Sequence, residues 1–305
     1  MRIFLKTIVF LGLVGLAAFW YITRPQVLTE ADLPQAPGNV EHGEYIFYAS
    51  GCASCHAAPD AKGDDKLKLV GGHEFKTPFG TFYAPNISTD PEKGIGGWST
   101  LDFVNAVMRG VSPGGQHYYP AFPYASYQKM NIKDAVDLKA YMDTLPAVTS
   151  DVPEHDLPLP FKFRRALGGW KFLFMDDKPF KPDPSASEQV NRGAYLVRAL
   201  AHCGECHTPR NFLGGPETDW YLAGGPSPEG KGSIPNITPS KDGIGDWSEA
   251  DISSSMETGF TPDYDSFGGS MVAVQENMAK LSKEDRDAIA AYLKSVPPRA
   301  SRNKK

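Results

Sequence analysis

All four cysteines of this 305-residue chain lie in two copies of one pentapeptide, Cys-x-x-Cys-His. Two thiols three positions apart on a helical turn can each form a thioether with a vinyl group of haem, and the adjacent histidine can bind the iron. The spacing therefore predicts two covalent haem c groups, each attached through two cysteines and ligated by one histidine. The residues concerned are Cys52, Cys55 and His56 in the first copy, and Cys203, Cys206 and His207 in the second.

Two other kinds of site also use paired cysteines. A lone Cys-x-x-Cys pair can form a redox disulfide or supply half of a zinc site. A zinc site needs four converging ligands, whereas these two pairs are 151 positions apart and each is followed directly by histidine. We therefore favour haem attachment over a zinc site or a disulfide.

The two motifs lie in an internal repeat. Short segments around the first motif recur around the second at offsets of 149 to 151 residues. Solenoid repeats have much shorter periods, so this pattern predicts one domain used twice. The matched segments are 43–46 with 193–196, 85–88 with 235–238, 94–99 with 243–248, and 140–146 with 291–297.

Each copy shows the same order of helix signals. One helix leads into the motif, a second begins at a serine cap, and a last helix is stopped by proline. Strand signals are weak throughout, so the pattern predicts an all-α fold. The expected spans are 40–57 and 187–207 for the first helix, 99–110 and 248–259 for the second, and 132–145 and 282–296 for the last.

Residues 1–24 have the features of a membrane segment. Arg2 and Lys6 precede an uncharged run over residues 7–22 that ends in aromatic residues, and the whole stretch can cross about 30 Å of hydrocarbon. A cleaved secretory signal is the alternative, but a small-x-small cleavage site is missing from the sequence. We expect an uncleaved anchor in the cytoplasmic membrane, with the soluble body on the periplasmic side.

The remainder divides into three parts. Residues 38–148 and 187–298 are expected to form the two haem domains, joined by a linker over residues 149–186. The middle of the linker is basic and aromatic, which is typical of a connector packed between domains or of a docking surface for a partner subunit or the membrane. The formal charge of −5 argues against nucleic acid as a partner.

The chain resembles, over nearly its whole length, the membrane-bound cytochrome c subunits of bacterial alcohol, gluconate and aldehyde dehydrogenases. Those subunits often have three haems, so this chain is similar to a shorter relative with two. The segments that carry the resemblance are Gly-Cys-Ala-Ser-Cys-His at 51–56, Tyr-Pro-Ala-Phe-Pro-Tyr at 119–124, Cys-His-Thr-Pro-Arg-Asn at 206–211, Gly-Gly-Ser-Met at 268–271, and the closing stretch at 290–298.

The resemblance and the helix order together predict two tandem class I cytochrome c domains after an N-terminal transmembrane helix. The resemblance implies that electrons arrive from a catalytic dehydrogenase subunit and leave to a quinone, a cytochrome or a terminal oxidase of a respiratory chain. It implies no catalytic centre in this chain.

The second haem has a clear candidate for its sixth iron ligand. Met271 follows Gly-Gly-Ser in the loop before the last helix, where the distal methionine of this fold belongs and where the family has its ligand. A methionine ligand favours ferrous iron and raises the potential. The alternative is that Met271 packs as a flexible apolar residue.

The first haem lacks the corresponding methionine. The family pattern often reads Tyr-Pro-Ala-Met-Pro-Tyr, and this chain has Phe122, which cannot bind iron, in the place of that methionine. We expect Met130, just before the last helix, to be the ligand. His117 and Met108 are alternatives, and His117 would give a bis-histidine site of lower potential. An open iron site is the remaining alternative.

These observations predict a membrane-anchored dihaem cytochrome c that transfers electrons and is not itself an enzyme. A haem enzyme with one open iron site, such as a dihaem peroxidase, is the alternative hypothesis. A haem sensor is disfavoured because the sequence contains no output domain. Binding of carbon monoxide or cyanide would separate the first two hypotheses, because an iron with six ligands binds neither readily.

Overall fold

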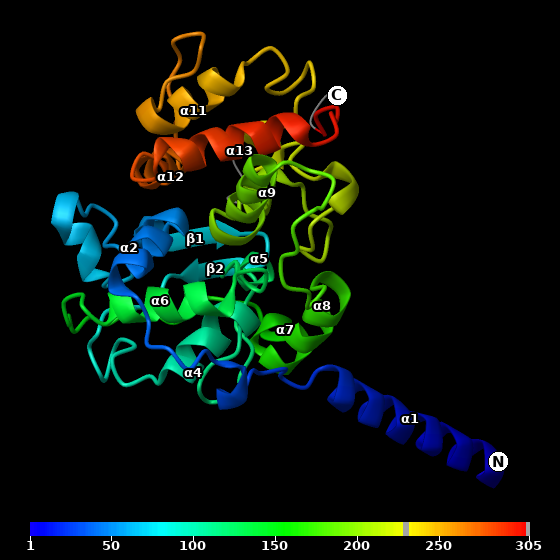
Figure 1. Cartoon of the computed structure of the whole chain (residues 1–305). Helices are drawn as coiled ribbons and strands as arrows, with labels where there is room; N and C mark the ends of the chain where they lie inside the picture. Colours follow the sequence, from blue (N-terminus) through cyan, green and yellow to red (C-terminus); the bar gives the residue numbers. More distant parts are fainter. Residues whose placement is uncertain (228–231, 303–305) are drawn as a thin grey trace.

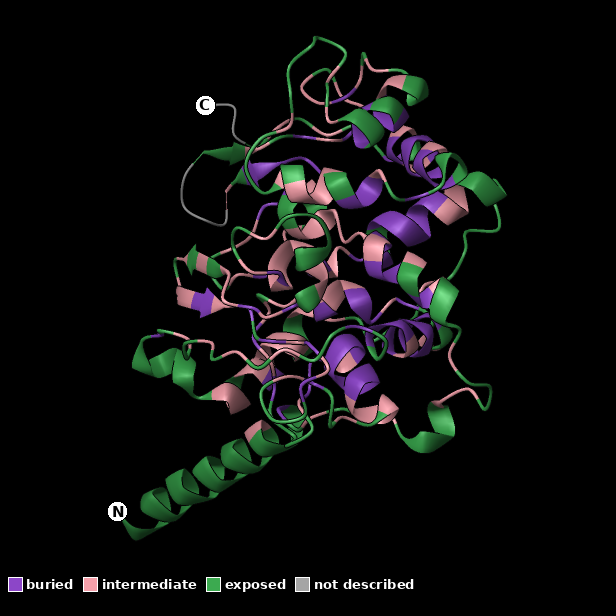
Figure 2. Ribbon diagram, turned by 90° about the vertical axis from the view of Figure 1, so that its left-hand side faces the viewer, coloured by how far each residue is buried: buried purple, intermediate pink, exposed green. Residues whose placement is uncertain are grey.

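The computed structural model describes residues 1–227 and 232–302. The N-terminal helix α1 (Arg2–Ile22) projects from a body of short helices (Figure 1). None of its side chains is buried by the rest of the described chain, and its length and apolar composition suffice to cross a membrane. Figure 2 shows α1 almost entirely exposed, while the buried residues gather in the helices of the body.

The first copy of the repeat forms a group of helices around the first motif. Helix α2 leads toward the motif helix α3, and α6 closes the copy by packing on α2. A short antiparallel hairpin joins β1 to β2. The elements are α2 (Val40–Ala49), α3 (Cys52–His56), the 3-10 turn η2 (Gly63–Lys68), β1 (Glu74–Thr77), β2 (Gly80–Tyr83), α4 (Thr100–Val104), the π-helical turn η3 (Asn105–Arg109), α5 (Tyr124–Tyr127) and α6 (Ile132–Met142).

The second copy repeats this plan. Helix α9 leads toward the motif helix α10, α13 packs on α9, and β3 pairs with β4 in a two-residue hairpin. Helices dominate both copies, so the all-α prediction is confirmed. The elements are α9 (Glu188–Tyr195), the π-helical turn η5 (Leu196–Leu200), α10 (Gly204–His207), the 3-10 turn η6 (Thr218–Trp220), β3 (Gly225–Pro226), β4 (Ser233–Ile234), α11 (Glu249–Thr258), α12 (Met271–Met278) and α13 (Lys283–Ser295).

The first and last helices of each copy cross at a glycine. A Cβ atom on Gly43 in α2 would lie 1.9 Å from the backbone oxygen of Asp137 in α6. A Cβ atom on Gly193 in α9 would lie 1.8 Å from the backbone oxygen of Ala288 in α13. No side chain fits at such distances, so both crossings require glycine. The Gly-x-Tyr repeated in the sequence therefore marks the crossing point of each domain.

The second helix of each copy begins as the sequence predicts. The hydroxyl of Ser99 accepts a hydrogen bond from the backbone N–H of Asp102, and Ser248 accepts one from Asp251, each at 3.1 Å. Both aspartates accept in return from the cap residue, which completes two capping boxes. Both helices end before a glycine in the left-handed conformation.

The helix expected to run into each motif is interrupted, so the continuous spans 40–57 and 187–207 are wrong. Gly51, with a φ of 63°, separates α2 from α3. His202, with a φ of 43°, stands at the equivalent break in the second copy. A left-handed residue redirects the chain, which sets each motif on a short helix of its own.

A one-residue insertion distinguishes the two breaks. Cys52 lies nine positions after Gly43, whereas Cys203 lies ten positions after Gly193. The π-helical turn η5 lies within the longer stretch and absorbs the additional residue. The helix crossing and the motif therefore keep the same relation in both copies.

The segment between the copies contacts both of them and the end of α1. The Nζ atom of Lys171 donates to the backbone oxygen of Arg109 at 2.6 Å in the first copy, and Trp170 Nε1 donates to Leu213 at 3.1 Å in the second. Arg165 Nη2 donates to the backbone oxygen of Trp20 at 2.7 Å. The elements of this segment are α7 (Leu159–Lys162), the 3-10 turn η4 (Arg164–Ala166) and α8 (Leu167–Phe174); a further turn, η1 (Glu30–Asp32), follows α1.

Candidate haem sites

Each motif histidine is held through one ring nitrogen. The Nδ1 atom of His56 lies 2.9 Å from the backbone oxygen of Pro85, and that of His207 lies 2.8 Å from the oxygen of Pro235. A carbonyl oxygen only accepts, so Nδ1 carries the hydrogen and Nε2 keeps its lone pair. Burial lowers the pKa of both imidazoles, which keeps them neutral. Both rings are therefore prepared to bind iron through Nε2.

The two prolines belong to the repeated Pro-Asn-Ile element, whose asparagine fixes the loop. Asn86 Nδ2 donates to the backbone oxygen of Val148, beyond the end of α6, at 2.8 Å. Asn236 Nδ2 donates to the backbone oxygen of Arg299, beyond α13, also at 2.8 Å. The chain after each last helix thus holds the carbonyl that orients the histidine. Sequence reasoning missed this role, although the element recurs at nearly the same distance from both histidines.

The surroundings of the motif thiols favour an uncharged sulfur. Burial raises the pKa of Cys52 and of Cys203 to about 12. Burial, with an added contribution from Cys206, raises the pKa of Cys55 to about 11. A thioether to haem carries no charge, whereas zinc binds thiolates, so these sites fit haem attachment. The influence of Cys206 on Cys55 also shows that the two motifs lie close together.

The motifs meet at an interface between the copies. Asn277 Nδ2 of α12 donates to Ser54 Oγ of the first motif at 2.8 Å. Ser126 Oγ of α5 donates to Glu205 Oε1 of the second motif at 2.6 Å. Ser54 and Glu205 hold the same place in their motifs, and Asn277 and Ser126 each precede the cap of the last helix by five residues. Each motif therefore contacts the equivalent segment of the other copy.

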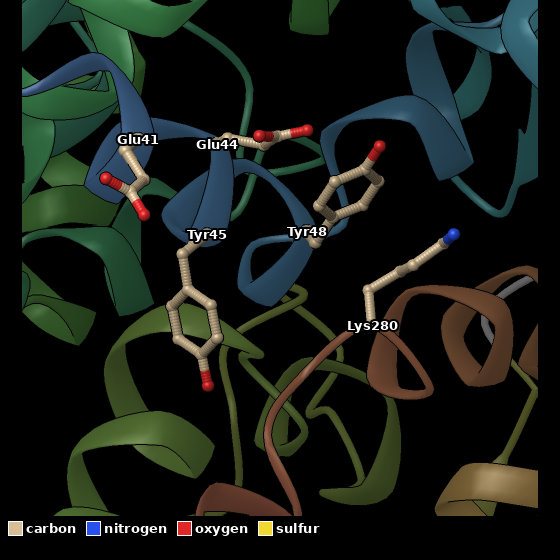
Figure 3. A pocket seen from close by; sticks show the side chains of 5 residues that line it. All are labelled: Glu41, Glu44, Tyr45, Tyr48 and Lys280. Carbon is tan, nitrogen blue, oxygen red and sulfur yellow. The ribbon is translucent and has the colours of Figure 1, made fainter.

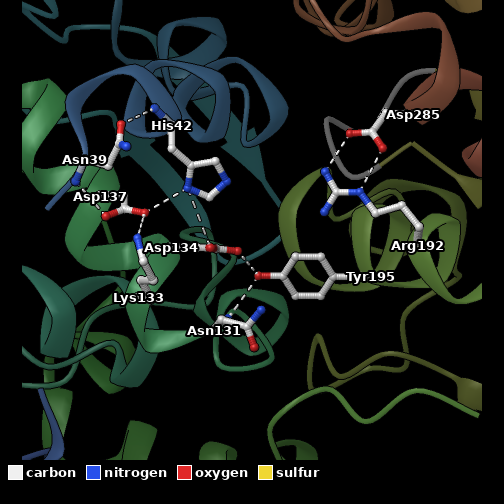
Figure 4. A network of polar contacts seen from close by, with 9 residues as sticks. All are labelled: Asn39, His42, Asn131, Lys133, Asp134, Asp137, Arg192, Tyr195 and Asp285. Atoms are coloured by element: carbon white, nitrogen blue, oxygen red, sulfur yellow. Dashed lines mark hydrogen bonds and ion pairs between the residues drawn. The ribbon is translucent and has the colours of Figure 1, made fainter. Parts of the chain in front are cut away.

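Two tyrosines make reciprocal contacts of the same kind between the copies. The hydroxyl of Tyr45 in α2 donates to Asp285 in α13, and that of Tyr195 in α9 donates to Asp134 in α6. Figure 3 shows Tyr45 reaching from α2 toward the second copy, and Figure 4 shows Tyr195 reaching Asp134. The tyrosines are repeat equivalents, and each aspartate is the third residue of its helix. Such exchanged contacts between equivalent residues define a pseudo-twofold relation between the copies.

The two aspartates of these pairs have different side chains beside them, as Figure 4 shows. Arg192 donates to both carboxylate oxygens of Asp285, at 2.8 Å from Nε and 2.6 Å from Nη2. The equivalent residue of the first copy, His42, has its Nδ1 atom 3.9 Å from Asp134 and 2.8 Å from Asp137. The interface is therefore symmetric in its tyrosines and asymmetric in the residues beside its aspartates, arginine in one copy and histidine in the other.

A polar cleft marks the outer edge of this interface. Glu41, Glu44, Tyr45 and Tyr48 of α2 line one side, and Lys280 of the second copy lines the other (Figure 3). The Nζ atom of Lys280 lies 5.9 Å from the centre of the Tyr48 ring. The cleft thus joins an acidic helix face to a lysine from the opposite copy.

The loop after the second helix has the same hydrogen bond in both copies. The backbone N–H of Tyr118 or Phe267 donates, at 2.8 Å, to the glycine that ends the preceding helix. Four positions further along, Phe122 of the first copy corresponds to Met271 of the second. The loop geometry therefore aligns the methionine of one copy with the phenylalanine of the other.

Met271 does not lie in a loop, as the sequence suggested, but is the first residue of α12. Its side chain is half-buried, and the neighbouring Val272 is 44% exposed. The helix start is directed by the preceding Gly-Gly-Ser, in which Gly269 has a φ of 58°. Its role as an iron ligand stays a prediction.

The candidates for the sixth ligand of the first haem are all buried but differ in surroundings. Met130 is 1% exposed and directly precedes the cap of α6, where the equivalent residue of the second copy is Leu281. Met108 is buried in η3, within the core of the first copy. The Nε2 atom of His117 lies 2.9 Å from the backbone oxygen of Thr23, so His117 is engaged by the end of α1.

Tyr127 connects the turn of Met130 to the first motif. Its hydroxyl donates to the backbone oxygen of Ser50 at 2.9 Å, and its own backbone oxygen accepts from the N–H of Met130 at 2.9 Å. Burial, reinforced by Cys52 and Cys55, holds the pKa of Tyr127 far above its usual value. The turn that carries Met130 therefore lies against the first motif. Sequence reasoning missed Tyr127, because no local pattern marks it.

Comparisons with known proteins agree with the resemblance seen in the sequence. The chain is 52% identical over 283 residues to a diheme cytochrome c-type protein of Cereibacter sphaeroides, an alignment that covers 93% of this chain and 94% of that protein. It is 38% identical over 265 residues to the fructose dehydrogenase cytochrome subunit of Gluconobacter japonicus, covering 86% of this chain and 53% of the relative.

A third relative is the cytochrome c subunit of alcohol dehydrogenase (quinone) of Gluconobacter oxydans, 35% identical over 267 residues. That alignment covers 85% of this chain and 55% of the subunit, so the chain spans about half the length of these dehydrogenase subunits. The family model for cytochrome c matches residues 40–146 and 190–297. Because that model covers both copies and each copy holds its own attachment motif, the chain belongs to the cytochrome c family and carries two covalently bound haem c groups.

Proposed function

We propose that this protein is a membrane-anchored dihaem cytochrome c that passes electrons from a dehydrogenase to a quinone, a cytochrome or a terminal oxidase. The observation that carries the proposal is the meeting of the two motifs across the pseudo-twofold interface. Ser54 and Glu205 of the motifs both make hydrogen bonds to the opposite copy, which brings the two attachment sites together. Relatives that are cytochrome subunits of fructose, gluconate and alcohol dehydrogenases support a dehydrogenase as the electron donor.

The membrane part of the proposal rests on α1 and its contacts with the body. The guanidinium of Arg165 lies 4.2 Å from the centre of the Trp20 ring and donates to the backbone oxygen of that residue, so the body is fixed to the end of the apolar helix. Arg2 and Lys6 stay on the cytoplasmic side. The body then lies in the periplasm, anchored to the cytoplasmic membrane.

The cysteines and the histidine of each motif would hold one haem. Each haem supplies an iron that takes up and releases one electron. The Pro85 and Pro235 carbonyls fix the ring orientation and tautomer of His56 and His207. The buried Tyr127 donates to the backbone oxygen of Ser50 and so lies against the start of the first motif.

We further propose Met271 as the sixth iron ligand of the second haem and Met130 as that of the first. The alignment of Met271 with the distal position supports the first assignment, and the contact of the Met130 turn with Tyr127 supports the second. His117 is the weaker candidate, because its Nε2 atom is engaged by Thr23.

A haem enzyme with one open iron site is the second candidate function. One observation favours it: Phe122, which cannot bind iron, stands where the second copy has Met271. Such a protein would react with a small ligand such as peroxide at the first haem alone.

Purification of the tagged full-length protein from membranes in mild detergent tests the proposed function. We expect a dehydrogenase subunit to co-purify, and its substrate to reduce both haems in the complex. The Cys203→Ala/Cys206→Ala variant serves as the control and should give about half of the absorbance change. The proposal fails if no dehydrogenase substrate reduces the haems, and turnover of hydrogen peroxide would favour the second candidate.

A further inference from the structure

Three side chains that can bind a metal ion converge where α2 meets α6. The Nδ1 atom of His42 lies 2.8 Å from Oδ2 of Asp137 and 3.9 Å from Oδ1 of Asp134. The ligand atoms of the three residues all lie within 4.8 Å of one another. Ligands that bind one zinc ion tetrahedrally at about 2.0 Å are about 3.3 Å apart. The two contacts of His42 lie on either side of that value, so a small movement of side chains would close the site around an ion.

The protein holds the second oxygen of each carboxylate. Oδ2 of Asp134 accepts a hydrogen bond from the hydroxyl of Tyr195, and Oδ1 of Asp137 accepts one from the backbone N–H of Asn39 at 2.8 Å. The remaining oxygen of each carboxylate contacts Nδ1 of His42 (Figure 4). Hydrogen-bond partners of this kind orient metal ligands and raise their affinity for the ion.

Both carboxylates are buried and have little positive charge beside them. Asp134 is 7% exposed and Asp137 is 0% exposed. Within residues 1–227 and 232–302, the two share one ion pair with a lysine or arginine, in which Lys133 Nζ lies 2.6 Å from Oδ2 of Asp137. Buried charges are normally paired or bound to a metal ion. A divalent cation would therefore balance the charge that one lysine leaves unmatched.

The second copy shows the same place with an arginine. Arg192 occupies the position of His42 and donates to both oxygens of Asp285. Ala288 occupies the position of Asp137, so one carboxylate is matched there by one guanidinium. The first copy has a second carboxylate, and an imidazole in the place of the guanidinium. This is the exchange expected where a metal ion takes the role of an arginine.

The ligand atoms select the kind of ion. One imidazole nitrogen and two carboxylate oxygens suit zinc, which accepts this combination and can keep water in a fourth position. Calcium and magnesium prefer oxygen ligands throughout. The side chain of His42 is 41% exposed, so an ion can reach the site from solvent.

We propose that His42, Asp134 and Asp137 bind one zinc ion at the interface between the two copies. On binding, Nδ1 of His42 gives its lone pair to the ion, and the hydrogen of the neutral ring moves to Nε2. Lys133, whose side chain is 58% exposed, turns from Asp137 to solvent. Because Asp134 also accepts from Tyr195 of the second copy, the ion links the crossing of α2 and α6 to the contact between the copies. The site does not depend on which donor or acceptor the haems use.

Calorimetry with zinc chloride tests the site on the full-length protein with both haems, in detergent and in a buffer that does not bind metal ions. Asp134→Asn removes one charged ligand but keeps an oxygen that can accept from Tyr195. Asp285→Asn is the matched control, because it makes the same change at the equivalent position of the second copy. His42→Arg is a second variant, which gives the first copy the arginine that the second copy has at this position.

We expect the wild type and Asp285→Asn to bind one zinc ion with equal affinity. Asp134→Asn and His42→Arg should bind it at least about a hundredfold more weakly, because losing a ligand costs more than losing a partner of a ligand. Zinc should also raise the unfolding temperature of the wild type and the control, but not that of the two variants. Pyridine haemochrome checks that every variant keeps both haems.

X-ray absorption at the zinc edge of the one-to-one complex identifies the ligands independently of any variant. The proposal predicts nitrogen and oxygen neighbours at about 2.0 to 2.2 Å and no sulfur at about 2.3 Å. It is overturned if the wild type binds no zinc, if both variants bind as the wild type does, if calcium binds as tightly as zinc, or if sulfur surrounds the ion. None of these results bears on electron transfer, which reduction of the haems by a dehydrogenase substrate tests separately.

Discussion

The two copies share the features that hold a haem and differ in the features that would tune it. Both copies have a glycine where the first and last helices cross. In both, a proline carbonyl accepts a hydrogen bond from the motif histidine, and an asparagine donates to the chain after the last helix. At the position proposed for the distal ligand, the second copy has Met271 and the first has Phe122. At the interface the second copy has Arg192 and the first has His42. The two copies therefore share one scaffold and differ at the proposed distal ligand and at the basic residue beside the interface aspartate.

The copies also differ in their neighbours. The first copy packs against the end of α1 through His117 and against α8 through Arg109 (Figure 1). The loop of the second copy between α11 and α12 exposes Phe260 and Tyr264, which are 59% and 94% exposed. The first copy therefore contacts the apolar helix α1, while this exposed aromatic loop belongs to the second copy.

The largest expected effect is the loss of one haem while the haem of the other copy is kept. Cys203→Ala/Cys206→Ala should lose one of two haems and leave the spectrum of the first domain, because each copy has its own helices and its own histidine–proline contact. Cys52→Ala/Cys55→Ala should do the reverse. Pyridine haemochrome per mole of protein measures the result. Loss of both haems in either variant would show that the copies do not fold independently.

The next effect concerns the distal ligands. Met271→Ala should open the second haem, lower its potential and create carbon monoxide binding there alone, and Met130→Ala should do the same at the first haem. The two effects should add, because the sites belong to different domains. Redox titration and carbon monoxide spectra check both variants. An unchanged first haem in Met130→Ala would transfer the role to Met108 or His117.

The glycine crossings should respond alike in both copies. Gly43→Ala and Gly193→Ala each place a Cβ atom within 2 Å of a backbone oxygen, so each should destabilise its own domain by about 3 kcal/mol. Urea unfolding followed separately at the two haems measures this loss. Gly12→Ala in α1, where a Cβ atom meets open space, is the matched control. Equal stability of all three variants would refute the close crossing.

The tyrosine–aspartate hydrogen bonds between the copies should contribute less to the free energy of unfolding than the glycine crossings do. Tyr45→Phe removes the hydrogen bond to Asp285 of the opposite copy and should cost about 1 kcal/mol. Tyr195→Phe removes the hydrogen bond to Asp134 and also the acceptor of the Asn131 backbone N–H, at 3.0 Å, so it should cost about 1 to 2 kcal/mol. The loss should be larger for Tyr195, because Asp134 lacks the two-fold arginine contact that still holds Asp285. Denaturant unfolding of both variants measures the difference. A larger loss for Tyr45 would contradict the asymmetry of the interface.

The smallest expected effect is the loss of stability at low pH that comes from Asp285. Burial opposes it, but hydrogen bonds from Arg192 and Tyr45 hold the pKa of Asp285 below its usual value. A lowered folded pKa stabilises the protein above the unfolded pKa of about 3.9, and this stabilisation disappears as pH falls through the folded pKa. Asp285→Asn should therefore remove about 0.5 kcal/mol of acid-sensitive stability. Unfolding curves between about pH 2 and pH 6 check the change, and an identical pH dependence in the variant would contradict it.

The sequence predicts most of the architecture because repetition doubles every signal. The motifs, the capped second helix and the final helix all appear twice at offsets of 149 to 151 residues, and the structure contains them. The helix break at Gly51 and the π-helical turn before Cys203 were not predicted, because a single left-handed residue and a one-residue insertion leave the hydrophobic pattern intact.

The site was predicted in part for a physical reason. Cysteine and histidine spacing is local, so candidate haem ligands and attachment points can be predicted from neighbouring residues, and these assignments stay predictions. The Pro85 carbonyl on His56, the role of Tyr127 and the Tyr195–Asp134 contact join residues 29 to 77 positions apart. Such contacts depend on the packing of the two copies, which no local pattern specifies.

Carbon monoxide titration of the reduced full-length protein tests the central claim most directly, because electron transfer through two closed irons leaves no vacant site for a ligand. The account predicts that the wild type binds no carbon monoxide at either haem, and that Met130→Ala binds one molecule at the first haem. Binding of one carbon monoxide per wild-type protein would contradict it and would favour a haem enzyme with an open first iron.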